Sequence, residues 1–112
     1  MTEPSLVICQ RTFQQDVAGE PKSFRVAWMQ PVADRNDWVC QFVIEWPDRP
    51  WRAVRIFGVD SVQALLLAMK SASAELYAAE PQVYLFEPDD VLNLPILSNV
   101  ADLEAARTKG RS

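Results

Sequence analysis

The side chains of this chain that could carry out chemistry are carboxylates, serines, cysteines and arginines, because the sequence contains no histidine. That absence excludes the Ser-His-Asp and Cys-His nucleophile systems and most zinc sites. Paired carboxylates could still transfer protons or bind a hard cation. The residues considered for such chemistry are Glu87, Asp89 and Asp90, then Asp34 and Asp37, and the serines Ser61, Ser71 and Ser73.

None of these residues lies in a pattern that a catalytic or metal site requires. Neither carboxylate group has the spacing of an EF-hand loop, and the serines lie in no nucleophile-elbow motif. Solvated loops explain both carboxylate groups, and Asp89 is expected to cap a turn. The sequence therefore predicts a protein without catalytic activity, bound metal or cofactor.

One arginine is expected among aromatic side chains. The expected alternation of its strand places Arg55 on a face rich in Trp and Phe, where a guanidinium could bind the carboxylate or phosphate of a small ligand. Stacking on a ring, or an ion pair with an acid such as Glu75, would explain the same arginine without a ligand. The second explanation is preferred, and a small anionic-ligand site at Arg55 is the alternative.

A further group of candidates surrounds the turn PDRP at residues 47–50. Trp and Arg are the residue types that dominate binding hot spots when a loop exposes them. Two Trp rings stacked across the hairpin would explain the same pattern structurally, and this explanation is preferred. The candidates for contact with a protein partner are Trp46, Arg49, Trp51 and Arg52.

Composition limits the class of protein. The 112 residues are 49% hydrophobic and 23% charged, which predicts one folded domain with a core over residues 5–97 and a flexible tail at 106–112. A net charge of −4 offers no basic face to nucleic acid. The sequence shows neither a signal peptide nor a membrane span. Cys9 and Cys40 have no nearby cysteine, so we expect free thiols in a cytoplasmic protein.

Alternating apolar residues predict an antiparallel meander of about four strands, at residues 5–13, 22–30, 38–46 and 51–59. Residues 14–21 and 31–37 are expected to be loops. The last two strands suggest a register in which Trp46 lies opposite Trp51. The pairs that follow are Glu45 with Arg52, Val43 with Val54, Gln41 with Ile56, Ile44 with Ala53, Phe42 with Arg55, and Cys40 with Phe57.

The stretch GVDSVQALLLAMKSASAELYA, residues 58–78, predicts one long helix. Asp60 is a good N-cap, and Gln63 three residues later completes a capping-box pattern. Leu67 falls on the opposite side from the predicted apolar stripe and is therefore expected to contact a second neighbour. The stripe expected to face the sheet is Val62, Leu65, Leu66, Met69, Ala72, Ser73 and Leu76.

The sheet is also expected to be apolar on both faces. One face carries the side chains that alternate from Trp38 to Trp46. The other is expected to carry Val39, Val43, Val54 and Ile56 around the pair of Glu45 with Arg52. An antiparallel sheet that leaves one face in water is mostly polar on that face. The C-terminal residues 83–108, a second copy or a partner protein could each cover the surplus apolar surface.

The run G-V-D-S-V-Q-A-L-L-L-A at residues 58–68, preceded by Trp38-x-Cys40, resembles a family of short uncharacterised bacterial proteins. In that family a β-meander is followed by a G-x-D-x-x-Q-A-L helix and a hydrophobic-Pro element, which Leu94-Pro95 matches. The resemblance covers residues 22–96. It implies the α+β fold and a loose similarity to immunity proteins, but no catalytic residue.

The predicted fold is therefore α+β, a meander with one long helix on one face and a short C-terminal strand or helix. The predicted function is a non-catalytic protein-interaction domain. It would act as an immunity-type protein that binds a toxin or as a homodimer, with Leu67 as a second contact. No nucleic acid and no membrane are expected as partners.

Overall fold

The computed structural model describes residues 6–97 together with Glu104 and Arg107. Its described elements are β1 (Val7–Val17), β2 (Glu20–Met29), β3 (Val32–Asp34), β4 (Asp37–Ile44), β5 (Arg52–Gly58), α1 (Ser61–Ala78) and β6 (Val83–Tyr84). The strands form one antiparallel sheet in the order β3-β4-β2-β1-β6, and β5 pairs with β4. The α+β class is confirmed, but the sheet has six strands where about four were predicted.

The first hairpin is longer than its sequence suggests. Residues 14–21, predicted as a loop, continue β1 and begin β2, and Val17 pairs with Glu20 across a two-residue turn. Ala18 and Gly19 both have positive φ, 54° and 81°, as the tightest hairpin turns require. Alanine rarely adopts positive φ, so only Gly19 of the two turn residues indicated this turn in the sequence.

The predicted register of the second hairpin is wrong by one residue. Ile44 pairs with Arg52 and Phe42 pairs with Val54, so Val54 and Ile56 face the helix while Arg55 faces away from it. The predicted register would have placed the guanidinium of Arg55 under the helix, and burying an unpaired charge is costly. The sheet instead turns the apolar alternate residues of β5 toward the core.

The helix begins as predicted. Asp60 Oδ1 accepts a hydrogen bond from Gln63 N at 2.8 Å, and Gln63 Oε1 accepts one from Val59 N at 2.7 Å. These bonds satisfy donors that the first helical turn leaves without partners.

The side of α1 that faces the sheet matches the predicted stripe in part. Ala72, Ser73 and Leu76 are buried as predicted, and Leu65 and Met69 pack against the core. The helix also buries Ala64 and Ala68, whereas Val62 and Leu66 are exposed. A Cβ placed on Gly58 would lie 2.5 Å from Ala64 N, so the start of the helix approaches the end of β5 very closely. Small side chains are therefore required at this contact, and the larger leucines turn toward its edges.

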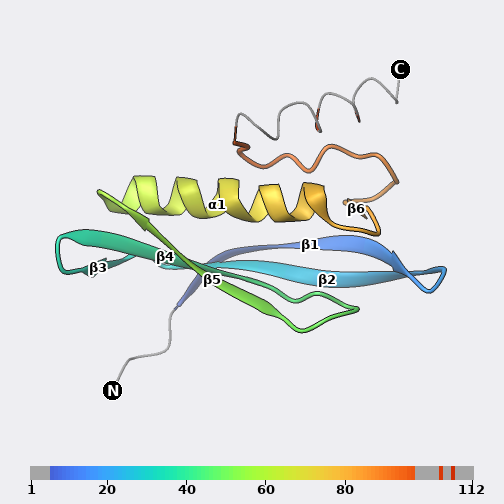
Figure 1. Cartoon of the computed structure of the whole chain (residues 1–112), viewed down its shortest axis with the longest axis horizontal. Coiled ribbons are helices and arrows are strands. Elements are labelled where there is room, and N and C mark those ends of the chain that lie inside the picture. Colours follow the sequence, from blue (N-terminus) through green and yellow to red (C-terminus); the bar gives the residue numbers. More distant parts are fainter. Residues whose placement is uncertain (1–5, 98–103, 105–106, 108–112) are drawn as a thin grey trace.

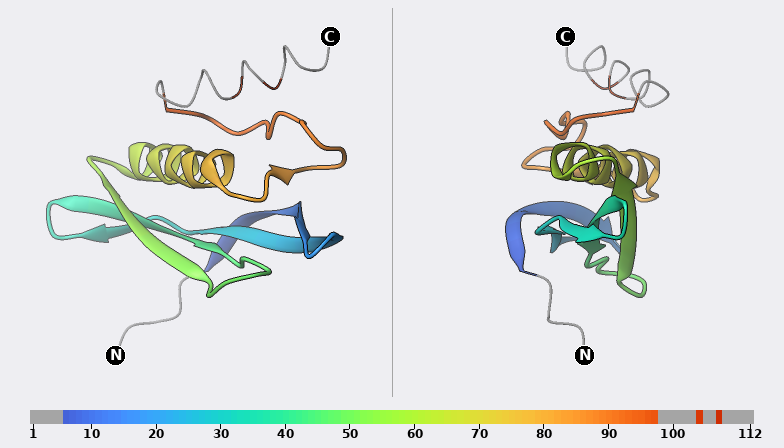
Figure 2. Two further views of the ribbon diagram at one scale, coloured as in Figure 1. Left: turned by 45° about the vertical axis from the view of Figure 1, so that its right-hand side comes forward. Right: turned by 90° about the vertical axis from the view of Figure 1, so that its left-hand side faces the viewer.

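The C-terminal residues cover the helix and not the second face of the sheet. β6 pairs with β1 at the edge of the sheet, and the described chain after β6 runs across α1 on the side away from the sheet, as Figures 1 and 2 show. The hydroxyl of Tyr77 accepts a hydrogen bond from Leu92 N at 2.9 Å and donates one to Glu104 at 3.0 Å. The buried guanidinium of Arg107 donates to the carbonyls of Val83 and Asp90.

Arg107 is the described part of the tail predicted as flexible over residues 106–112, and the other residues of that tail lie outside the described chain. The core lies between the sheet and α1. Its largest fully buried side chains are Trp28, Phe13, Phe42, Ile44, Leu76 and Leu92.

Candidate functional site

Two of the predicted contact residues in the turn between β4 and β5, Trp46 and Arg49, contact other parts of the same chain. Trp46 is buried and stacks on Phe24, with ring centroids 5.4 Å apart. The guanidinium of Arg49 lies 4.7 Å above the Trp46 ring and donates to the backbone carbonyl of Glu80 at 2.8 Å. Trp51 is the exposed aromatic member of the predicted contact loop, at 65%, and Arg49 and Arg52 are also exposed.

Arg49 also forms a two-pronged hydrogen bond with Asp48, at 2.7 and 2.9 Å. This bond lowers the pKa of the Asp48 carboxyl and raises the pKa of Arg49. Arg52 forms an ion pair with Glu75 on the helix. Two arginines predicted to contact a partner therefore stabilise the hairpin and its junction with α1.

Arg55 is exposed, on the face of the sheet away from the helix. Its guanidinium lies 3.9 Å from the carboxylate of Asp34 and 5.6 Å from the ring centroid of Phe57. The expected position among the core aromatic residues is wrong, because the register shift reverses the direction of every side chain in β5. Glu75, named as a possible ion-pair partner of Arg55, is bound by Arg52 instead.

On the helix, Leu67 is half-buried, while Val62 is 73% exposed and Leu66 is also exposed. The apolar side chains of α1 most accessible to a partner are thus those assigned from the sequence to the core stripe. A contact at Leu67 stays a prediction.

The carboxylate candidates serve backbone and side-chain contacts. Asp90 is buried and accepts hydrogen bonds from the backbone N–H groups of Phe86 and Glu87. It is this residue, and not Asp89, that accepts the N–H groups of the turn. Asp89 instead accepts a hydrogen bond from Gln82 at 3.0 Å.

Asp34 and Asp37 lie opposite each other in the β3–β4 hairpin. Within residues 6–97, Glu104 and Arg107, no group of three or more His, Cys, Asp or Glu side chains is placed to hold a metal ion.

The two cysteines are free thiols shielded from water. Cys40 is buried, and its thiol donates to the carbonyl of Met29 at 3.3 Å. Burial raises the pKa of the Cys40 thiol to about 11. Burial also raises the pKa of the Cys9 thiol, although the nearby charge of Arg11 lowers it by a smaller amount. A thiol with a raised pKa is a poor nucleophile at neutral pH.

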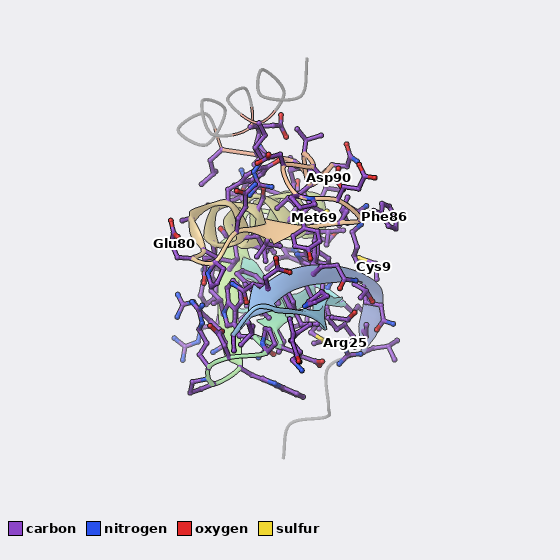
Figure 3. The ribbon with its side chains drawn as sticks, turned by 90° about the vertical axis from the view of Figure 1, so that its right-hand side faces the viewer. Cys9, Arg25, Met69, Glu80, Phe86 and Asp90 are labelled. Atoms are coloured by element: carbon purple, nitrogen blue, oxygen red, sulfur yellow. The ribbon has the colours of Figure 1, made fainter. Side chains whose placement is uncertain are left out.

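Exposed apolar side chains also lie on the face of the sheet opposite α1, here called the reverse face. In the described part of the chain, α1 and the residues that follow β6 lie on the other side of the sheet (Figures 1 and 2), whereas β6 itself pairs with β1 within the sheet. Figure 3 shows Arg25 below the sheet, whereas Met69, Phe86 and Asp90 lie above it. The side chains on the reverse face include Val7, Ala27, Met29, Val32, Val39, Val43, Ala53 and Phe57, with Arg25, Asp34, Asp37, Gln41, Glu45 and Arg55 among them. Ala27, Met29 and Val39 are buried on this face.

One row of this face is apolar across three strands. Val39 of β4 pairs with Val32 of β3 on one side and with Phe57 of β5 on the other. Val32 and Phe57 are 47% and 48% exposed, and they flank Val39, which is buried without belonging to the core between sheet and helix. Val39 and Val43 were placed on this face from the sequence, but Phe57 and Val32 were not.

Four charged residues of the reverse face lie in two pairs of opposite sign, and a fifth, Asp37, lies opposite Asp34. Arg25 binds Glu45, with Nη2 2.6 Å from Oε2, and Arg55 lies near Asp34. The predicted pair of Glu45 with Arg52 does not form, because the true register places Arg52 opposite Ile44. Alternation in β2 and β4 could have identified the Arg25–Glu45 pair, had the register of those two strands been tested.

Among the described residues, no helix is long and apolar enough to cross a membrane. No curated protein and no solved structure matches the sequence. Residues 9–89 match the model of a family described as a domain of unknown function (DUF6968). Because this match spans well over half of the chain, the protein belongs to that family.

Proposed function

We propose that this chain is a non-catalytic protein-interaction domain that binds its partner through the reverse face of the sheet. The observation that carries the proposal is the apolar row of Val32, Val39 and Phe57, which no described segment of the chain covers. Val32 and Phe57 are exposed on either side of the buried Val39, and exposed apolar side chains that gather on one face mark interaction surfaces.

Physical chemistry supports this use of the face. An antiparallel sheet with one face in water normally carries polar side chains there. Burial of a Val or Phe side chain stabilises a complex by roughly 1.5–3 kcal/mol, so even the half-exposed Val32 and Phe57 would contribute substantially to binding. The ion pairs at both ends of the face would supply a polar rim.

The immunity-type role implied by the resemblance is a specific form of this proposal, in which the partner is a toxin. The thiols favour a non-catalytic role because burial raises their pKa. Free thiols also suit the reducing cytoplasm, where we propose that the protein resides. The geometry does not favour an anion site at Arg55, since this exposed side chain already lies beside Asp34.

The test compares the wild-type chain with Phe57→Glu and with Phe86→Glu. Both phenylalanines are exposed, but Phe86, at 87%, lies on the opposite side of the sheet (Figure 3) and is the matched control. We expect Phe57→Glu to abolish an association that the wild type and Phe86→Glu retain.

Association is measured in two ways. Light scattering after size exclusion detects self-association of the purified chain. Affinity purification from the native host, followed by titration of the purified partner, detects a different protein. Circular dichroism confirms that both variants fold. If both variants bind as the wild type does in each assay, the reverse face is not the contact surface.

A further inference from the structure

We infer that the outer edge of β1 is a second contact site, at which a partner protein adds a short extended segment to the sheet as a further strand. This site is separate from the reverse face, because it uses backbone groups at the edge of the sheet and not the side chains of one face. Proteins commonly bind extended peptides by such strand addition, since every backbone N–H and C=O requires a hydrogen-bond partner.

The register shows which backbone groups of β1 point outward. Thr12 lies opposite Arg25 of β2, but the Arg25 carbonyl accepts a hydrogen bond from Glu45 N of β4 at 2.9 Å. Thr12 and Arg25 are therefore a pair whose N–H and C=O groups point away from each other. Because this direction alternates along a strand, the backbone groups of Gln10 and Gln14 also point to the outer edge, where β6 pairs with Gln14.

β6 covers only part of this edge. It pairs with Gln14 and Gln15, and in the described part of the chain no strand pairs with the outer side of β1 before Gln14. Gln10 and Thr12 are exposed. The outward N–H and C=O groups of these two residues are therefore open to a further strand.

The contacts after β6 show why the chain does not cover this edge itself. If β6 continued in its register, Phe86 would lie opposite Thr12 and Pro88 would lie opposite Gln10. Phe86 N instead donates to the carboxylate of Asp90 at 2.8 Å, and Pro88 has no N–H to donate. The segment that follows β6 therefore cannot complete the ladder along β1, and an extended segment from another protein can.

The two open edges of the sheet differ in charge. Among the described strands β5 pairs only with β4, and it carries Arg52 and Arg55. Charged side chains on an edge strand oppose pairing with another chain. In β1 the only charged residue within residues 7–13 is Arg11, whose guanidinium is bound by two backbone carbonyls of the segment after β6. The edge of β1 therefore lacks the protection that β5 has.

The side chains beside the open stretch indicate what kind of segment fits it. Gln10 and Thr12 are uncharged, and the apolar Val7 and Ile8 near them are 39% and 44% exposed. Cross-strand neighbours are most stable when their side chains match. The partner segment would therefore be uncharged, with a β-branched residue beside Thr12 and an apolar residue near Ile8. The register shift between Val7 and Cys9 ends the regular edge, so the added strand is short.

Peptide selection on the full-length chain tests this site. The probe is a displayed library of random peptides, from which those that bind the wild type are selected and synthesised. We expect a bound peptide to slow hydrogen exchange at the amides of Gln10 and Thr12 by at least about tenfold, because each N–H gains an acceptor. NMR of the isotope-labelled chain, with and without the peptide, measures this exchange.

Two substitutions at Thr12 separate the backbone from the side chain. Thr12→Pro removes an outward N–H but no hydrogen bond to β2, and proline is tolerated on an edge strand. We expect it to weaken peptide binding by about tenfold or more, because one hydrogen bond is lost. Thr12→Val keeps the N–H and the β-branched shape, so this matched control should bind as the wild type does. Circular dichroism confirms folding, and the exchange measurement on the wild type decides the question if Thr12→Pro does not fold.

The outcomes separate this site from the reverse face. Strand addition is overturned if the library yields no binding peptide, or if the selected peptides bind Thr12→Pro as tightly as the wild type. Peptides that are lost in Phe57→Glu and kept by Thr12→Pro bind the reverse face, which supports the proposed function and overturns the edge site. Slow exchange at Gln10 and Thr12 in the chain alone also overturns it, because the chain itself or a second copy would then cover the edge.

Discussion

Gly58 lies where the end of β5 meets the start of α1, and its missing side chain allows the two elements to touch. A Cβ at this position would lie 2.5 Å from Ala64 N and 2.8 Å from Ala64 Cα, which are backbone atoms that cannot rotate away. Gly19 differs, because its φ of 81° is unusual for other residues but nothing lies within 4 Å of the position that a Cβ would take.

Substitution by asparagine distinguishes these two reasons for glycine. Asparagine tolerates positive φ, so Gly19→Asn should change the free energy of unfolding by no more than about 0.5 kcal/mol. Gly58→Asn should lower it by about 1–3 kcal/mol through overpacking. Urea unfolding measures both, and equal losses at the two positions would show that the contact with Ala64 is not the cause.

Cys40 predicts a specific response to alkali. Burial raises the pKa of its thiol from 9.0 to about 11, so the folded state holds this proton more tightly than the unfolded state does. The stabilisation is fully present below about pH 9 and is lost as the pH rises toward about 11. We expect the free energy of unfolding to fall less steeply over this interval in Cys40→Ala than in the wild type. Parallel curves from urea unfolding at each pH would contradict this.

At the scale of elements, the C-terminal residues are attached to the helix through Tyr77. Its hydroxyl both accepts from Leu92 N and donates to Glu104, and the guanidinium of Arg107 lies 4.7 Å from the centre of its ring. These contacts lie at the C-terminal end of α1. On the same side of the helix, Val62 and Leu66 near its N-terminal end are exposed. The polar contacts of Tyr77 therefore help to define where the covering segment lies.

Removing the Tyr77 hydroxyl should loosen this segment. In Tyr77→Phe the buried N–H of Leu92 loses its acceptor, and we expect the free energy of unfolding to fall by about 1–3 kcal/mol. Hydrogen exchange should accelerate at residues 90–97 and not in β2 or β4.

Tyr84→Phe is the matched control, because it also removes a hydroxyl bound to a carboxylate, that of Asp16 at 2.7 Å, but leaves the Leu92 N–H satisfied. We expect exchange at residues 90–97 to be unchanged in this variant. Equal acceleration in both variants would contradict a specific role for Tyr77.

At the scale of the whole molecule, the sheet separates two apolar layers. One is filled by α1, over which the described residues after β6 run, and the other is the reverse face. The sequence indicated the second apolar layer, because the apolar residues Val39 and Val43 alternate with core residues in β4. The prediction that the chain's own C-terminal residues might cover the second layer is wrong for the described part, which covers the helix.

The register of β5 shows why local patterns could not place the reverse face completely. Pairing Trp46 with Trp51 matched Glu45 with Arg52 and Val43 with Val54, so it satisfied the cross-strand rules at those pairs, although it placed Arg55 opposite Phe42. The competing register was decided by α1, which buries Val54 and Ile56 and leaves Arg55 in water. A helix outside the hairpin thus determined which side of β5 faces the core, and with it the positions of Phe57 and Arg55.

The sequence alone determined the α+β class, the cap at Asp60, the extent of the long helix to within a few residues and the absence of histidine chemistry, because these depend on residue identity and on contacts between near neighbours in the chain. Only the tertiary structure decided the rotation of α1 and the face of β5 that stays in water. Both depend on how closely Gly58 and Ala64 approach, and a distance between two packed elements is not encoded in the periodicity of either one.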